Sequence, residues 1–333
     1  MAESELGEVM RFLRAVFSVD ENHRMFQEDV LRWKCFAPHP FWEGSRGYAL
    51  RYKNQIAAFG CVVPCRFLTG SGAVASCNVI DWAASKAVPG AGILLYRHIQ
   101  GLAGTMINIY GSDDALKALP AMGFRMVAEV HHYTRTLRPW LHFRQVGWQD
   151  WKSPLRLARD VWEWARTART GRRALTVRRV ENFEGVADTA FPDPSVTHQV
   201  VCARTPESLG YFLKCPAAKL EAYLLEREAQ AGYFVLSRVG GQCRIADLWI
   251  RSADERDWAA AYAAATEAAS NDPQTSEVTV AAQMPPPAYR HTHSEPVFLL
   301  DPDSRLEGRT DLCISLMEND GFYWSAHPVN NRR

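Results

Sequence analysis

The fold of this chain is decided by one short stretch, Ala87-Val88-Pro89-Gly90-Ala91-Gly92-Ile93. A strand-like apolar run, residues 73–84, precedes it, and residues 93–102 follow with helical spacing. A helix N-terminus leaves backbone N–H groups without partners and carries partial positive charge, so it suits a phosphate. Glycine also lets a ligand come close to the backbone. The stretch is typical of either a phosphate-binding loop or a tight strand-to-helix turn. Since proline has no N–H, the donors expected for a phosphate are those of Val88, Gly90, Ala91, Gly92 and Ile93.

The residues around this loop predict a mixed sheet flanked by helices, an α/β fold. Strand-helix-strand crossovers imply parallel pairing, whereas the early hairpin, which turns at Lys53-Asn54, is antiparallel. In chain order we expect helices 8–17 and 25–36, strands 47–51, 55–65 and 73–84, helix 93–102, strand 105–110, helix 113–122 and strand 125–137.

Two common phosphate-binding motifs do not fit the loop. A dinucleotide-binding turn needs Gly-x-Gly-x-x-Gly, but position 95 is leucine, and a P-loop needs Gly-Lys-Ser/Thr. The frame Ala87-x-x-Gly90-x-Gly92, followed by a strand, a helix and Gly123-Phe124, resembles the GNAT superfamily of acyl-CoA-dependent N-acyltransferases. The resemblance covers residues 8–138 and implies that acetyl-CoA or another acyl-CoA binds as cosubstrate. It assigns cofactor binding to Trp82, Ala83, Val88, Gly90, Ala91, Gly92, Ile93 and Asp113.

The chain departs from the pattern of that family at two positions. The family's Arg or Gln is Ala87 here, which removes one side chain directed at the phosphates. The tyrosine that many relatives use as a general acid falls on Leu119. We therefore expect a loop that relies on backbone donors. The leaving thiolate must then be protonated by another group, or the chemistry differs.

The second half of the chain repeats the outline of the first. Gly47-Tyr48 and Gly232-Tyr233 each begin a strand that follows a helix-rich segment. We expect helices 206–214, 218–229 and 254–270, and strands 232–239, 242–251, 277–282, 297–300 and 312–317. The resemblance then implies two tandem GNAT-like domains, 1–138 and 176–333, each with a mixed, mostly antiparallel sheet. The second is degenerate, because residues 251–257 hold no glycine loop, so we expect it to bind no CoA and to supply packing and part of the acceptor site.

Residues 139–175 join the two predicted domains as a basic, tryptophan-rich helical connector. Between Arg138 and Arg179 there are eleven basic and three acidic residues, a local net charge of +8, together with five tryptophans. Three interpretations stay open. The tryptophans pack between the domains with the arginines solvated, or residues 154–179 lie on an anionic membrane surface, or they bind an anionic acceptor such as a nucleotide-linked sugar.

The bulk composition is that of an ordinary soluble protein. Hydrophobic residues make up 47% and charged residues 23%, and the net charge of +1 gives no overall attraction to DNA or membranes. No apolar run reaches the length of a transmembrane segment, and the acidic N-terminus does not look like a signal peptide. We therefore expect a cytoplasmic protein whose eight cysteines are free thiols.

Acyl transfer to an amine needs a base, which we expect near the strand that leads into the loop. Asp81 lies on that strand within an apolar run, and His132 follows Gly123-Phe124 on the next long strand, so both are candidate bases. Tyr110 is a candidate acid. We expect no metal, because His291, His293 and His327 have no carboxylate or cysteine at ligand spacing.

Three functions compete at this point. The first is an N-acyltransferase that moves an acyl group, with acetyl preferred, from acyl-CoA to the amine of a small acceptor such as an amino sugar or a biosynthetic intermediate. The second is a Fem-like aminoacyl-tRNA-dependent transferase, whose RNA would be held by the connector. The third is a non-catalytic CoA-sensing or scaffold protein. The oligomeric state is left open.

Overall fold

The computed structural model describes residues 1–109, 111–148, 150–167, 175–197, 199–227, 229–239, 241–306 and 312–323. The first elements follow the order expected from the sequence: two helices, three strands, a helix, a strand, a helix and a strand. They are α1 (Leu6–Phe17), α2 (Glu28–Phe36), β1 (Gly47–Tyr52), β2 (Gln55–Thr69), β3 (Gly72–Ala84), α3 (Ala91–Ala103), β4 (Thr105–Ile109), α4 (Asp113–Ala118) and β5 (Arg125–Thr136).

The remaining elements begin with the helices of the connector and end with two late strands. They are α5 (Pro139–Val146), α6 (Ser153–Thr167), β6 (Thr176–Val180), α7 (Pro194–Thr197), β7 (Val200–Cys202), α8 (Pro206–Leu213), β8 (Lys219–Arg227), β9 (Ala229–Val239), β10 (Gln242–Ile250), α9 (Glu255–Ser270), β11 (Glu277–Ala282), β12 (Arg290–Leu300) and β13 (Leu312–Cys313).

Lys219–Arg227, most of the helix that we expected at 218–229, form a strand instead. Alanine, leucine and glutamate favour a helix there, but such propensities are small compared with tertiary packing. β8 lies between β6 and β9 and pairs with both. Five consecutive residues from Glu221 to Leu225 are buried, so both faces of the strand are covered. The run is an interior strand. Such a strand lacks the alternation of apolar and polar residues that would identify it in the sequence.

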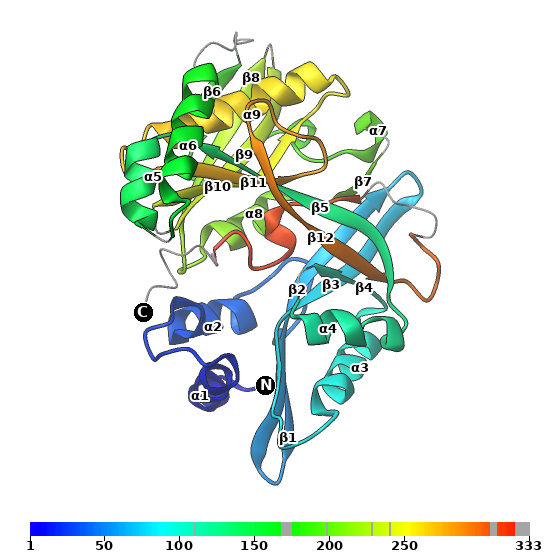
Figure 1. The fold of residues 1–333 in the computed structure, drawn as a ribbon. Coiled ribbons are helices and arrows are strands. Elements are labelled where there is room, and N and C mark those ends of the chain that lie inside the picture. The colour runs from blue at the N-terminus through cyan, green and yellow to red at the C-terminus, as the bar shows by residue number, and fades with distance from the viewer. Residues whose placement is uncertain are drawn as a thin grey trace.

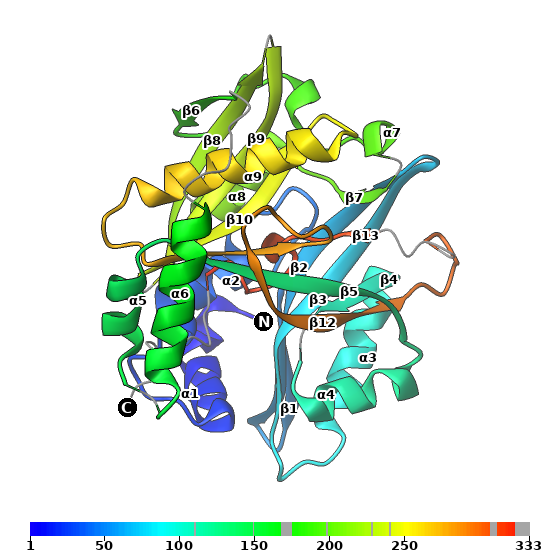
Figure 2. The same ribbon diagram turned by 45° about the horizontal axis from the view of Figure 1, so that its top comes forward.

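All strands of the described residues belong to one continuous mixed sheet, with helices on both faces (Figures 1 and 2). The strand order is β13-β7-β2-β3-β4-β12-β5-β11-β10-β9-β8-β6, and β1 pairs with β2. β3 is parallel to β4 and β10 is parallel to β11, while the other long pairings are antiparallel. The mixed α/β fold expected from the sequence is therefore confirmed.

Two C-terminal segments run back to the sheet, where β12 enters the centre and β13 pairs with β7 at the edge. β12 is longer than the strand we expected at 297–300, and it lies between β4 and β5 and pairs with both. β13 is shorter than expected, because a 3-10 helix, Leu316–Glu318, replaces the end of the predicted strand 312–317. The segment 312–323 then contacts both halves of the chain, since Asn78 of β3 donates to the Glu318 carbonyl and Arg244 of β10 donates to that of Gly321.

The hydrophobic core lies on both faces of the sheet. Leu95 and Ile99 of α3 pack on one face of β2 and β3. α1, α2 and α8 belong to a second cluster, which also buries Leu306 and the apolar residues of the segment 312–323. α9 covers β9, β10 and β11 through its alanine-rich side. Within the described residues, no helix is both long and apolar enough to cross a lipid bilayer.

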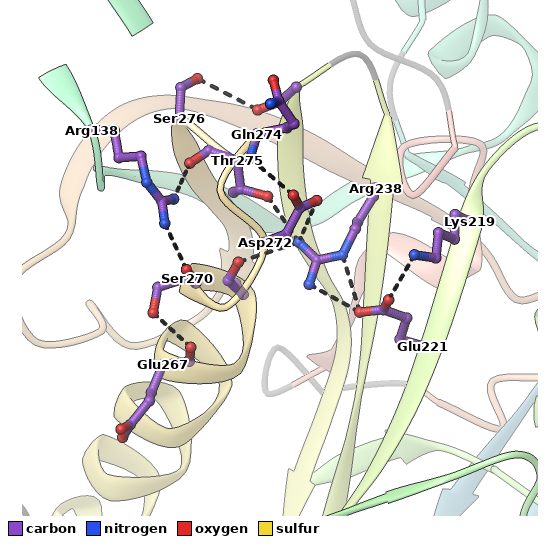
Figure 3. Close-up of polar contacts among 12 residues, drawn as sticks. Arg138, Lys219, Glu221, Arg238, Glu267, Ser270, Asp272, Gln274, Thr275 and Ser276 are labelled. Atoms are coloured by element: carbon purple, nitrogen blue, oxygen red, sulfur yellow. Dashed lines mark hydrogen bonds and ion pairs between the residues drawn. The ribbon is translucent and has the colours of Figure 1, made fainter. Parts of the chain in front are cut away.

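A polar cluster surrounds the turn between α9 and β11, and its side chains bind one another and the backbone (Figure 3). Arg238 of β9 forms an ion pair with Glu221 at 2.9 Å and donates to the Thr275 hydroxyl. Arg138, which follows β5, donates to the backbone carbonyls of Ser270 and Thr275. These bonds anchor the turn between α9 and β11 to both neighbouring strands.

Candidate functional site

The glycine loop connects β3 to α3. Gly90 is the residue before the helix and has a φ of +81°, a left-handed conformation that glycine adopts without steric strain. A Cβ at Gly90 would meet nothing within 4 Å. The backbone at this position is therefore open to an approaching ligand.

The structure reduces the set of backbone donors that we expected in the loop. Val88 N–H donates to the Ser85 carbonyl, and Ala91 N–H donates to the Val88 carbonyl, so these two close the turn. No side chain caps the helix and its first turn holds no acidic residue. The donors left at this N-terminus without an intrahelical acceptor are those of Gly90, Gly92 and Ile93.

Gly92 allows α3 to pack closely on β3. Its carbonyl accepts a hydrogen bond of 3.0 Å from Trp82 Nε1. A Cβ at Gly92 would lie 3.1 Å from the Ala84 Cβ, which is tighter than ordinary van der Waals contact. The loop is therefore held against β3 by Trp82, and the structure brings Trp82, Gly90 and Gly92 together as the sequence suggested.

β3 and β4 separate beside this loop. Their parallel pairing covers three residues and ends at Asn78 and Ile107. Beyond that point β3 stays with β2 and β4 stays with β12. Asp81 and Trp82 together face Gly60 on β2, which is a β-bulge, and Asp81 has a φ of +52°. A bulge bends its strand, so it turns the end of β3 away from β4.

The second half repeats these features, except for the glycine loop. β10 pairs in parallel with β11 as far as Ile245, carries a bulge next to Asp247, and leads into α9. The N-terminus of α9 is capped, because the Asp254 carboxylate accepts from the backbone N–H of Arg256. Glu255 and Asp257 add two carboxylates to the first turn. Negative side chains satisfy this end of the helix, which makes it unsuitable for a phosphate.

Asp81 lies in a buried ion pair beneath the bulge. Its carboxylate is 2.8 Å from Lys34 Nζ of α2, and the two side chains are 2% and 1% exposed. Burial acts to lower the pKa of Lys34, but the charge of Asp81 outweighs it and raises that pKa above the usual value. The sequence offered no sign of this partner, which lies 47 residues earlier in the chain.

Asp320 and Tyr323 of the C-terminal segment lie close to this ion pair. Lys34 Nζ is 5.3 Å from the centre of the Tyr323 ring. Burial and the nearby charge of Asp81 together raise the pKa of Asp320 to about 6, although Lys34 acts to lower it. Sequence reasoning missed Asp320, because only the fold brings residues 312–323 to β3.

A second buried ionic group centres on Arg204, which lies between β7 and α8. Its guanidinium binds Asp247 at 2.7 Å and also Glu318, and the Tyr233 hydroxyl donates to Asp247. Burial acts to lower the pKa of Arg204, but Asp247 and Glu318 raise it well above the usual value. The charges are paired, so this group ties β10 to the C-terminal segment.

His132 lies at the centre of the sheet, where β5 meets β12. Its ring stacks on that of His293, and its Nε2 is 3.9 Å from a carboxylate oxygen of Glu295. Burial lowers the pKa of His132 to about 3, helped by the neighbouring histidines and Arg244. His132 is therefore neutral at pH 7.

Comparisons with known proteins show which fold has this geometry. The sequence matches no protein family model and no curated protein. Solved structures match with probability 1.00. A GCN5-related N-acetyltransferase from Kribbella flavida has a TM-score of 0.57 at 14% identity, with 93% of this chain and 72% of that one covered. One from Anabaena variabilis has a TM-score of 0.54 at 11% identity, covering 90% and 70%.

The N-myristoyltransferase of Saccharomyces cerevisiae with bound myristoyl-CoA also matches, with a TM-score of 0.55 at 11% identity over 90% of this chain and 80% of that one. This chain has the GNAT fold. At these identities the likeness concerns the fold alone. It agrees with the family resemblance that the glycine loop and Gly123-Phe124 suggested.

Several residues predicted from the GNAT pattern stand elsewhere in the structure or outside its described part. Tyr110 is outside the described residues. Asp113 lies in the first turn of α4, which Ser112 caps. Leu119, at the position of the family's tyrosine, is fully buried, and Ala87 is exposed in the loop. The roles of Asp81, His132 and Tyr110 in catalysis stay predictions.

One interpretation of the sequence placed the tryptophans of the connector between the two halves of the chain, but they do not pack there. Trp140, Trp148, Trp151, Trp162 and Trp164 are each at least half exposed. α5 and α6 lie on the outside of the molecule (Figure 2). Along α6 and the turn before it, the exposed apolar residues recur at helical spacing as Trp151, Leu155, Ala158 and Trp162. This face of α6 is apolar and points to solvent.

A cavity of about 220 Å³ lies in the second half, beside β10, β11 and α9. Arg204, Asp247, Trp249, Trp258 and Tyr262 contribute to its walls. The residues that line it come from the second half of the chain, so the cavity is separate from the glycine loop.

Proposed function

We propose that the protein is an acyl-CoA-dependent N-acyltransferase that transfers an acetyl group to the amine of a small acceptor. The observation that carries this proposal is the N-terminus of α3, which lies beside two separating strands and which no side chain of the described residues caps. There the N–H groups of Gly90, Gly92 and Ile93 have no intrahelical acceptor, and a Cβ at Gly90 would meet no described atom within 4 Å. A pyrophosphate at this position would accept from those donors and interact with the positive end of the helix dipole. The exposed Lys86 adds a positive charge within the loop.

The gap between β3 and β4 then suits the pantetheine arm of the cosubstrate. Once the parallel ladder ends at Asn78 and Ile107, the backbone groups that face the gap can bond an amide-containing chain, as an added strand would. An arm laid in this gap would carry the thioester towards the bulge at Asp81. Acyl-CoA as cosubstrate and acetyl as its acyl group are both parts of the proposal.

The face that carries Asp81 is the proposed acceptor site. A base must take a proton from the attacking amine. Asp81 and His132 stay candidates. Asp320 joins them, because its pKa of about 6 is closer to neutral pH than that of an ordinary carboxyl group. Direct attack of the amine on the thioester gives a tetrahedral intermediate, and its collapse expels the CoA thiolate. Tyr110 stays the predicted acid that protonates this thiolate.

We also propose that the chain consists of two tandem GNAT-like units, 1–138 and 176–333, joined by 139–175, and that only the first binds CoA. The matching bulges of β3 and β10 and the parallel pairs β3–β4 and β10–β11 support the repeat. The capped, acidic N-terminus of α9 argues against a second pyrophosphate site.

The surface of α6 suggests a further partner. We propose that its exposed apolar face docks in the plane of an anionic membrane surface. Interfacial helices bury tryptophan and leucine and place basic residues at the headgroups, and the stretch from Arg138 to Arg179 has a net charge of +8. A site for RNA would expose mainly charged and stacking groups, whereas Leu155 and Ala158 are part of this face.

The main proposal is tested with acetyl-CoA and CoA binding by calorimetry. Gly90→Glu puts a carboxylate against the pyrophosphate, whereas Gly92→Glu forces α3 away from β3 and so displaces the donors. Each is expected to weaken binding by about 100-fold or more, equal to about 2.7 kcal/mol. Gly101→Glu is the matched control, because Gly101 is exposed at the other end of α3 with nothing near its Cβ. Circular dichroism checks that each variant folds. Equal affinity of all four proteins would refute the proposed loop, and absence of thiol release with a panel of amines would refute transfer.

A further inference from the structure

Three side chains with metal-binding atoms converge at the junction of β5 and β12. His132 and His293 face each other directly across the two strands. Their rings are parallel within 4°, with centroids 4.3 Å apart. Glu295 follows two residues after His293, and its carboxylate oxygens lie 3.5 Å from His293 Nε2 and 3.9 Å from His132 Nε2. One nitrogen or oxygen from each of the three residues lies within 4.8 Å of the others.

A bulge in β12 creates this arrangement. The pairing register shifts between His291 and His293, so the two histidines lie on opposite faces of the sheet although they are two residues apart. His291 joins His131 on the other face, where the Ser294 hydroxyl bonds to both rings. Among the described residues, only the first face brings a carboxylate oxygen within 4.8 Å of both histidine nitrogens. The spacing His291-Thr292-His293 therefore suggests a histidine pair that the fold does not form. The histidine that lies beside His293 is His132, which is distant in the sequence.

The carboxylate has an unmet requirement that a cation would satisfy. Glu295 Oε2 is shielded from solvent and has no hydrogen-bond partner among the residues that the structure describes. A buried polar atom left in this state costs free energy, and in native proteins an unexplained one often marks an ion or a water. The His293 side chain is 55% exposed, so the cluster is open to solvent on one side, which leaves room for entry of an ion and for a bound water.

We propose that His132, His293 and Glu295 bind a divalent transition metal, with zinc the best match. Two imidazole nitrogens and one carboxylate oxygen suit zinc, cobalt or nickel, whereas magnesium and calcium prefer oxygen ligands alone. In a tetrahedral site with bonds of roughly 2.1 Å, ligand atoms are about 3.4 Å apart. The nitrogen–oxygen distances of 3.5 and 3.9 Å are close to this value, and the two stacked rings must turn about their side-chain bonds so that both nitrogens aim at one ion. Water completes the shell on the exposed side.

This site shares His132, a candidate base, with the proposed acyl transfer, so its test measures metal binding and not activity. The full chain is stripped with a chelator, dialysed and titrated with Zn²⁺ by calorimetry and with Co²⁺ by visible absorption. The expected result is one strong site per chain with a tetrahedral cobalt spectrum. Zn²⁺ should also raise the melting temperature, because a ligand of the folded state stabilises it.

Three variants decide which residues bind the metal. His293→Ala and Glu295→Gln are each expected to weaken Zn²⁺ binding by roughly 100-fold, since even loss of an outer-shell partner costs 10–100-fold. His291→Ala is the matched control on the same strand and should bind as the unchanged protein does. Equal weakening in all three variants, or binding that none of them changes, would overturn the proposal. So would the absence of any strong site in a protein whose circular dichroism shows it to be folded.

Discussion

The buried ion pair between Lys34 and Asp81 allows a sharp prediction for stability. The two charged groups are 2.8 Å apart and almost fully shielded from solvent. With an effective dielectric constant of about 20, their attraction is about 6 kcal/mol. Removal of both charges from water offsets much of that gain, whereas removal of one partner leaves the other buried and unpaired. Single variants should therefore be far more damaging than the pair is stabilising.

We expect Lys34→Met and Asp81→Asn each to lower the free energy of unfolding by about 3–5 kcal/mol. Asparagine tolerates the left-handed backbone at position 81, so Asp81→Asn removes charge without adding backbone strain. The double variant should recover most of the loss, because no lone charge is left. Urea unfolding at pH 7, followed by tryptophan fluorescence, gives the coupling energy from the double-mutant cycle.

The control is Asp303→Asn, which breaks an ion pair of the same 2.8 Å length that is more than half exposed. It should cost less than about 1 kcal/mol. Additive losses in the Lys34/Asp81 double variant, or single losses as small as that of the control, would refute the reasoning. The same proteins test catalysis. A double variant that is folded yet inactive would support Asp81 as the base, and one that retains activity would leave Asp320 and His132 as candidates.

Two further predictions concern pH and membranes. Burial, with Arg46 and Arg204, lowers the pKa of His39 to about 3, so between pH 6.5 and 3 the unfolded chain binds a proton that the folded chain does not. The free energy of unfolding should therefore decrease as the pH falls below about 6.5, by about 1.4 kcal/mol per pH unit for this group. His39→Asn should reduce this slope by the contribution of one proton. An unchanged slope would show that His39 is not its source. The chain should sediment with vesicles that contain anionic lipid, and Leu155→Ala with Trp162→Ala should weaken this binding at least about tenfold, while Leu102→Ala, an exposed leucine of α3, should not. Binding to RNA but not to vesicles would contradict the membrane proposal.

Local patterns predicted much of the first half of the fold. The loop from Ala87 to Ile93 and the turn at Gly123 are visible in the sequence, because glycine marks positions with positive φ and helix starts with open donors. The helix expected at 113–122 is shorter, since α4 ends at Ala118 and Gly123 ends the 3-10 helix Pro120–Met122. Strand and helix order followed from hydrophobic spacing. What the sequence could not show was that Val88 and Ala91 would use their N–H groups to close the turn.

The errors and omissions share one physical cause, which is pairing between distant segments. β8 is built from helix-forming residues and becomes a strand because β6 and β9 bury it on both sides. Lys34 is an ordinary helix residue until the fold places it beside Asp81. His132 and His293 become neighbours only through the pairing of β5 with β12. No local pattern encodes such contacts.

The position of β12 also affects how the protein folds during its synthesis. β4 and β5 each pair with β12, and Asn108 faces Phe298, which is 190 residues later in the chain. At synthesis rates of 5–20 residues per second, a ribosome needs about 10–40 s to supply that strand. During this interval the nascent first half presents two unpaired strand edges, which are prone to pair with other chains. We therefore expect the nascent chain to need shielding of these edges, and a fragment that stops after β5 to be prone to aggregation.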